Sequence, residues 1–132
     1  MAPRVMVVDD DEAGATVVRM QLQQEGVEAT VALGGRQALE LLCEATCAGK
    51  TFDLMLLDIA MPDVNGWEVL RAVKCNPLWA DMRVIVLTGY ATTPDDMARV
   101  AGYDGVHVEK KGAYVNVVSK LTERLLADVG SS

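Results

Sequence analysis

Three aspartates directly follow or end two apolar runs. Asp9 and Asp10 come after the apolar run 5–8, and Asp58 ends the run 54–57. Two carboxylates about 4 Å apart repel by roughly 1 kcal/mol in water and about 4 kcal/mol at an effective dielectric near 20. A hard divalent cation such as Mg²⁺ relieves this repulsion and can bridge to phosphate oxygens. These residues therefore predict a Mg²⁺-assisted phosphoryl site, and no Gly-rich loop accompanies them to suggest a nucleotide.

A hydroxyl and an ammonium follow two further apolar runs. Thr88 ends the run 84–87, and Lys110 follows the run 106–108. If these runs are parallel strands joined by helices, all of their carboxyl ends lie at one edge of the sheet. We therefore expect Thr88 and Lys110 to share that edge with the aspartates.

The elements that must position these residues are read from hydrophobic spacing. Short apolar runs alternate with longer segments of helical periodicity, which predicts an α/β fold with a parallel sheet covered by helices on both faces. The predicted strands are 5–8, 27–32, 53–58, 84–87 and 106–108. The predicted helices run from an N-cap at Asp11 to about Glu25, over about 36–47, up to about Cys75, from Pro94 to Gly102, and along a closing stripe of Val115, Val118, Leu121, Leu125 and Val129.

Composition narrows the function classes. The chain has 132 residues, 51% of them hydrophobic and 23% charged, which predicts a single domain over residues 1–130 followed by a frayed tail. A net charge of −7 argues against direct nucleic-acid binding. No apolar stretch approaches the roughly 20 residues that a membrane-spanning helix needs, and no export signal is visible. We expect a cytoplasmic protein without membrane contact.

The cysteines form an odd-numbered set with no sequence-local histidine. They are Cys43, Cys47 and Cys75, and a chain of this size does not need disulfides to stabilise its core. Cys43 and Cys47 stand at i and i+4 of a predicted helix and could supply two metal ligands, but a closed zinc site needs four. We predict that these two are buried small apolar side chains, and that the protein resides in a reduced compartment.

Taken together, three motifs resemble those of a known family, the receiver domains of two-component response regulators. Val7-Val8-Asp9-Asp10 is similar to the family's acidic pair, Asp58-Ile59-Ala60-Met61-Pro62 with Asn65-Gly66 to its phosphoacceptor loop, and Val86-Leu87-Thr88-Gly89 to its switch strand. The resemblance covers nearly the whole chain. It implies a flavodoxin-like (βα)5 fold with strand order 2-1-3-4-5, in which strands 1 and 3 meet where such folds bind ligands.

The resemblance also implies a role for each site residue. Asp58 accepts a phosphoryl group from a histidine kinase or phosphotransfer protein. Asp9 and Asp10, with Asp58, hold Mg²⁺, which offsets the charge of the transferring group. Lys110 and the hydroxyl of Thr88 bind the phosphate oxygens.

A switch is implied as well. Movement of Thr88 toward the phosphate opens space for the aromatic ring of His107, and this shifts a two-state equilibrium of the surface formed by helix 4, strand 5 and helix 5. The output is contact with a downstream protein or output domain. The resemblance thus implies a switch rather than a turnover enzyme, and leaves the cognate kinase and the oligomeric state open.

The chain departs from the family pattern after the fifth strand. Receivers usually carry Lys-Pro there, whereas this chain has Glu109-Lys110-Lys111. Counting without a gap from Gly102 puts Glu109 in the lysine position, and a one-residue insertion near Gly105 puts Lys110 there. We favour Lys110, because that register also places His107 where the family's rotating aromatic stands.

Two further residues flank the expected phosphoryl group. Ala60 lies two residues after Asp58, and Tyr90 lies two residues after Thr88. Alanine leaves room for water while tyrosine can obstruct it, so the sequence predicts no phosphoryl lifetime.

The same residues are compatible with two alternative functions. The same carboxylates could serve a Mg²⁺-dependent phosphohydrolase with an aspartyl nucleophile, although Ala60 stands where that chemistry needs a general acid. The chain could also be a receiver-like interaction module that no longer takes phosphate.

Overall fold

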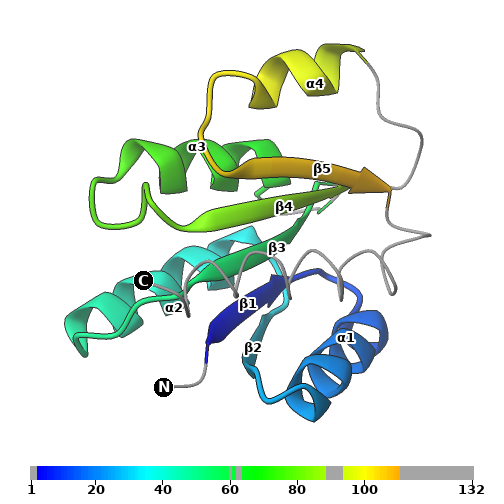
Figure 1. Cartoon of the computed structure of the whole chain (residues 1–132), viewed down its shortest axis with the longest axis vertical. Coiled ribbons are helices and arrows are strands. Elements are labelled where there is room, and N and C mark those ends of the chain that lie inside the picture. Colours follow the sequence, from blue (N-terminus) through cyan, green and yellow to red (C-terminus); the bar gives the residue numbers. More distant parts are fainter. Residues whose placement is uncertain (1–2, 60, 62–63, 89–93, 111–132) are drawn as a thin grey trace.

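The computed structural model describes residues 3–59, 61, 64–88 and 94–110, which form one five-stranded parallel sheet with helices between the strands (Figure 1). The strand order is β2-β1-β3-β4-β5, as predicted. The strands are β1 (Arg4–Val8), β2 (Glu28–Ala32), β3 (Leu54–Asp58), β4 (Arg83–Thr88) and β5 (Val106–Lys110). The helices are α1 (Glu12–Gln24), α2 (Gly35–Cys47), α3 (Gly66–Cys75) and α4 (Pro94–Val100).

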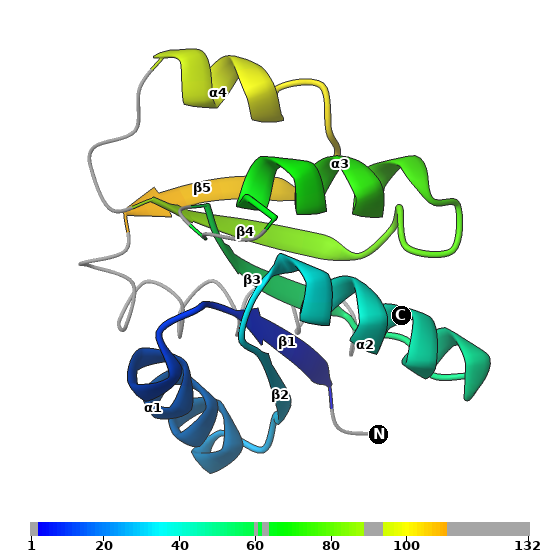
Figure 2. The ribbon, with the colours of Figure 1, turned by 180° about the vertical axis from the view of Figure 1, so that it is seen from behind.

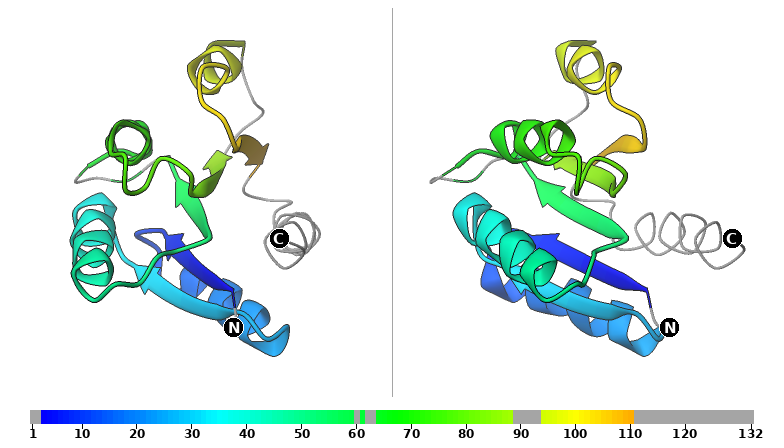
Figure 3. Two further views of the ribbon diagram at one scale, coloured as in Figure 1. Left: turned by 60° about the vertical axis from the view of Figure 1, so that its left-hand side comes forward. Right: turned by 90° about the vertical axis from the view of Figure 1, so that its left-hand side faces the viewer.

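Two layers of core separate the sheet from its helices. Helices α2 and α3 lie together on one face (Figures 2 and 3), where Met55 and Leu57 of β3 are in the cluster of buried side chains. Helix α1 covers the other face, where Leu54 and Leu56 join its buried residues. All five residues of β3 are buried. A continuous apolar run is typical of a parallel strand covered on both sides, because alternate side chains enter opposite cores.

Most predicted elements match the structure, with differences at their ends. Strand β5 continues to Lys110, two residues beyond the prediction. Asp11 occupies the N-cap position of α1, but its side chain makes no capping hydrogen bond. The predicted closing helix along Val115 to Val129 lies outside the described residues.

The prediction that Cys43 and Cys47 are buried is wrong, since both are exposed, as is Cys75. Helix α2 has a single buried face, and Ala38 and Leu42 occupy it. Positions 43 and 47 lie on a different stripe of the same helix. The apolar character of cysteine misled the assignment, because helical geometry rather than hydrophobicity decides which positions meet the sheet.

Within the described ranges, no helix combines the length and the apolar character required to cross a lipid bilayer.

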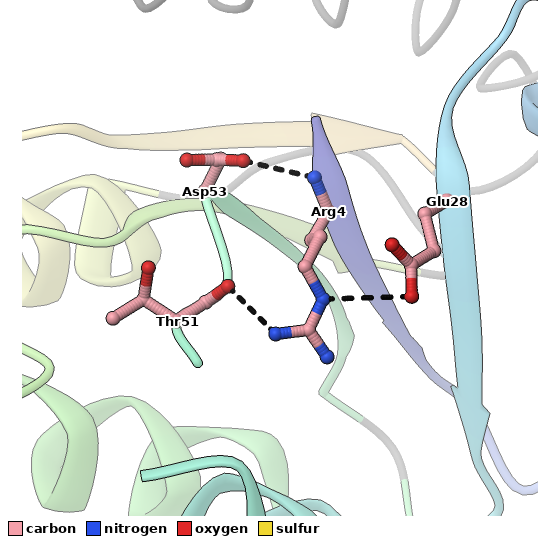
Figure 4. A network of polar contacts seen from close by, with 4 residues as sticks. All are labelled: Arg4, Glu28, Thr51 and Asp53. Carbon is pink, nitrogen blue, oxygen red and sulfur yellow. Dashed lines mark hydrogen bonds and ion pairs between the residues drawn. The ribbon is translucent and has the colours of Figure 1, made fainter. Parts of the chain in front are cut away.

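At the amino edge of the sheet, Arg4 joins three strands (Figure 4). Its backbone N–H donates to Oδ2 of Asp53 at 2.8 Å, and its Nη1 donates to the carbonyl of Thr51 at 3.0 Å. Its Nε lies 3.6 Å from Oε1 of Glu28, and its guanidinium stacks 4.4 Å from the centroid of the Phe52 ring. These contacts fasten β2 and the entrance to β3 onto β1, and they lie at the opposite edge from the predicted site.

Lys74, near the end of α3, fastens two loop segments to that helix. Its Nζ donates to the backbone carbonyls of Ala80 at 2.9 Å, Met82 at 2.8 Å and Asp104 at 2.9 Å. Burial lowers the pKa of Lys74, while the nearby charges of Asp104 and Asp81 act in the opposite direction. The ammonium thus ties the segment before β4 to the segment before β5.

Replacing Lys74 by Met keeps most of the side-chain stem and removes the donor. We expect Lys74→Met to lower the free energy of unfolding by about 1–3 kcal/mol, because three carbonyls lose a charged partner. The exposed Lys50 is the matched control, and Lys50→Met should stay within about 0.5 kcal/mol of the wild type. Urea unfolding followed by circular dichroism measures both, and equal midpoints for the two variants would contradict this role of Lys74.

Candidate functional site

Three carboxylates converge at the carboxyl edge of the sheet. One ligand oxygen from each of Asp9, Asp10 and Asp58 lies within 4.8 Å of the others. Asp9 and Asp58 are each 3% exposed, while Asp10 is exposed to solvent. The three aspartates therefore lie close together, as predicted. Two of them are buried, and the third faces water.

Strand pairing creates this proximity. β1 and β3 are hydrogen-bonded neighbours, and Val8 pairs with Leu57 in the register. The residues that follow this pair, Asp9 and Asp58, therefore lie side by side at the carboxyl edge of the sheet. Asp9 is held further by its own backbone N–H, which donates to the carbonyl of Ala32 at 3.0 Å, and by its Oδ1, which accepts from the N–H of Asp11 at 2.9 Å.

The segment after Asp58 folds tightly back onto that residue. The N–H of Ile59 donates to the carbonyl of Leu87 at 3.2 Å, and the N–H of Gly66 donates to the carbonyl of Ile59 at 3.0 Å. A Cβ atom at Gly66 would lie 2.5 Å from the carbonyl oxygen of Asp58 and 2.6 Å from Cα of Ile59. Gly66 is thus required by a close backbone approach, which fixes the first turn of α3 against the acidic strand end.

Asn65 and Gly35 support the same loop. Oδ1 of Asn65 accepts from the N–H of Glu68 at 3.1 Å and caps α3. A Cβ atom at Gly35, the first residue of α2, would lie 2.5 Å from the carbonyl oxygen of Val64. The sequence marks Asn65-Gly66 as a turn, but no local pattern reveals the contact between Gly35 and Val64, because it joins segments that are far apart in the chain.

Thr88 and Lys110 occupy equivalent places on neighbouring strands. Thr88 is 2% exposed and ends β4. In the register of β4 and β5 it pairs with Lys110, while Glu109 pairs with Leu87. Gly105 directly precedes β5 with a φ of 72°, a left-handed conformation that suits glycine.

Other predicted residues are placed as follows. His107 is an exposed residue of β5 whose backbone pairs with Ile85. Ala60 and Tyr90 lie outside the described residues.

Trp67 makes a cation–π contact that the sequence did not predict. It follows Gly66 in α3, and the guanidinium of Arg99 in α4 lies 5.0 Å from the centroid of its ring.

The donor set fits a hard divalent cation. Three carboxylates supply only oxygen ligands, and the exposed Asp10 leaves one side open to water. Mg²⁺ prefers oxygen donors and keeps several waters in its coordination shell. The site can therefore hold Mg²⁺ beside a nucleophilic carboxylate, an arrangement suited to phosphoryl transfer.

Comparison with known proteins identifies the class. The family model described as "Response regulator receiver domain" matches residues 5–120. The chain belongs to this family, whose members are signalling domains of two-component systems rather than classical enzymes and bind Mg²⁺ at an acidic pocket.

Individual relatives agree with that assignment. The chain is 35% identical over 104 residues to the response regulator MprA of Mycolicibacterium vanbaalenii, covering 79% of this chain and 41% of that protein. The chemotaxis protein CheY4 of Vibrio cholerae has 25% identity and a TM-score of 0.81, covering 95% of this chain and 99% of that one. The response regulator TrrA of Thermotoga maritima, solved in complex with Mg²⁺-BeF, has 27% identity and a TM-score of 0.68, covering 92% and 97%.

The chain is shorter than several curated relatives that it matches. It covers 43% of a probable transcriptional regulator of Pyropia yezoensis and 41% of the response regulator ArlR of Staphylococcus saprophyticus. The similarity therefore concerns the receiver part of those proteins.

Because Gly66 has no room for a side chain, Gly66→Ala should displace the loop after Asp58. We expect a loss of about 1–3 kcal/mol in the free energy of unfolding, the usual cost of overpacking. Gly102→Ala is the matched control, since a Cβ there meets no atom within 4 Å. Thermal or urea unfolding measures both, and a Gly66→Ala protein as stable as the control would refute the close contact.

Proposed function

We propose that this chain is a phosphorylatable receiver in which Asp58 is the phosphoacceptor and Asp9, Asp10 and Asp58 hold Mg²⁺. The observation that carries the proposal is the convergence of the three carboxylates within 4.8 Å at the end of β1 and β3. The similarity to TrrA, which was solved with Mg²⁺-BeF, supports the same chemistry.

The reaction is a phosphoryl transfer between proteins. A carboxylate oxygen of Asp58 attacks the phosphorus of a phosphohistidine on a histidine kinase or phosphotransfer protein. The new O–P bond gives an aspartyl phosphate, and the P–N bond to the histidine breaks. Mg²⁺ supplies charge stabilisation for the transferring group, while Asp9 and Asp10 keep the cation beside Asp58.

The partners for the remaining phosphate oxygens are Thr88 and Lys110. Thr88 ends β4 beside β3, and the strand register puts Lys110 level with it. The same register sets Glu109 level with Leu87, one residue short of the strand end. This arrangement supports Lys110 rather than Glu109 as the residue that binds phosphate.

Phosphorylation then acts through α4 and β5. Thr88 and His107 are the switch residues of the proposal, and Ala60 and Tyr90 flank the phosphoryl group. The output is a changed contact with a downstream protein or output domain, without turnover of a substrate beyond the phosphoryl group itself. Such a receiver works in the cytoplasm, where its kinase is supplied with ATP.

Acetyl phosphate with Mg²⁺ tests the acceptor directly. We expect intact-mass measurement to show the gain of one phosphoryl group in the wild type and none in Asp58→Asn, because the amide cannot act as the nucleophile. Asp11→Asn is the control, since Asp11 is an exposed acid beside the cluster, and it should label like the wild type.

Two outcomes of this experiment would overturn the proposal. Sustained release of phosphate with no stable adduct would favour the phosphohydrolase alternative. Absence of any mass gain in the wild type would favour an interaction module that takes no phosphate.

Metal binding can be measured separately by titration calorimetry in low salt. We expect Asp9→Asn and Asp10→Asn each to weaken Mg²⁺ binding by about tenfold or more, because each removes an anionic oxygen from the site. Asp11→Asn removes the same charge from the same loop and should change the affinity less than about twofold. Equal losses in all three variants would mean that general charge, rather than this cluster, attracts the ion.

A further inference from the structure

Helix α2 carries two exposed thiols that the phosphorylation chemistry does not use. Cys43 and Cys47 are one turn apart in α2, and both are exposed. Residues at i and i+4 lie on the same side of a helix. We propose that this thiol pair is a chelating site for a soft monovalent cation, cuprous copper, distinct from the oxygen site at Asp58.

The spacing favours a bridging metal over a disulfide. Side chains at i and i+4 have Cβ atoms about 5–6 Å apart, whereas a disulfide needs about 3.5–4.5 Å. The two cysteines therefore cannot be oxidised to one another while α2 stays helical. Zinc–sulfur bonds are roughly 2.3 Å long, and bonds of similar length to one ion hold two sulfurs up to about 4.6 Å apart, a separation compatible with the Cβ spacing of an i and i+4 pair.

The number and type of donors select the metal. Structural zinc takes four ligands in a tetrahedron. Among the described residues, the aspartates at the sheet edge are the one group of three or more His, Cys, Asp or Glu side chains close enough to hold an ion. The thiol pair thus offers two donors, and soft thiolates select cuprous copper over hard cations.

Neighbouring charges favour a cation at this place. Glu40 and Glu44 are exposed residues of the same helix, three residues before and one residue after Cys43, and they outnumber Arg36, the one cation among the described residues that line the same hollow as Cys43. Their negative potential raises the local concentration of cations. On binding, each thiol releases its proton to solvent, and copper remains in the cuprous state throughout.

The site is independent of the proposed phosphorylation. Cys43 lies eight residues along α2 from Gly35, which is about 12 Å at 1.5 Å per residue. Val64, in the loop after Asp58, lies against Gly35 and also lines one hollow with Cys43. The two sites nevertheless share no donor atom, so metal binding at the thiols and phosphorylation at Asp58 are measured separately.

The test is an anaerobic titration of the reduced protein with cuprous ion, in competition with a chromogenic cuprous chelator. We expect one ion per chain in the wild type. Cys43→Ser and Cys47→Ser should each weaken binding by at least about a hundredfold, because one thiolate cannot chelate. Cys75→Ser is the matched control, since Cys75 is also exposed, at the end of α3, and it should bind within about twofold of the wild type.

Three results would overturn the proposal. They are unchanged binding in the Cys43 or Cys47 variant, an equal loss in the Cys75 variant, and a complex of two chains per ion in native mass spectrometry. Circular dichroism of each variant verifies that α2 remains folded. Acetyl phosphate labelling of the same variants should match the wild type, which separates this site from the proposed acceptor.

Discussion

Mutual repulsion among three carboxylates is the constraint that the carboxyl edge of this sheet has to satisfy. Asp9 and Asp58 are almost fully buried and lie within 4.8 Å of each other and of Asp10. At an effective dielectric near 20, each such pair repels by about 4 kcal/mol at 4 Å. Folding tolerates this arrangement because the apolar strands that carry the acids are buried on both faces, and this burial contributes far more than the repulsion costs. The remaining repulsion favours the binding of positive charge at this edge. A divalent cation that prefers oxygen ligands provides that charge.

Two glycines give the acidic edge its geometry. Gly66 brings α3 against the carbonyl of Asp58, and Gly35 brings α2 against Val64 in the same loop. Neither position has room for a methyl group. Asp58 and Ile59 are therefore packed closely against α3, and Val64 against α2, which fixes the backbone on both sides of the acidic edge.

Sequence reasoning located the strand ends and the meeting of Asp9, Asp10 and Asp58, because parallel strands bring their carboxyl ends to one edge whatever lies between them. It missed features that depend on two distant segments approaching each other. The contacts of Lys74 with the carbonyl of Asp104 and of Gly35 with Val64 have no local signature. The exposure of Cys43 was misjudged for a related reason. The apolar character of cysteine allows burial, but the rotation of α2 about its axis decides which of its residues face the sheet. The sequence also could not show which of Glu109 and Lys110 stands level with Thr88. In the strand register Lys110 pairs with Thr88, and Glu109 pairs with Leu87.

The link from the acidic edge to α4 is short and weak. A helix of seven residues is far below the length at which helices are stable alone, so α4 depends on its tertiary contacts. One is the burial of Val100, and another is the guanidinium of Arg99 over the ring of Trp67. Trp67 directly follows Gly66, which packs against Asp58, so one aromatic side chain separates the acidic edge from α4. A cation–π contact at an exposed site is worth about 0.5–1 kcal/mol, and 1.4 kcal/mol changes an equilibrium constant tenfold. A movement of the first turn of α3 would therefore reach α4 through a contact whose loss costs little free energy.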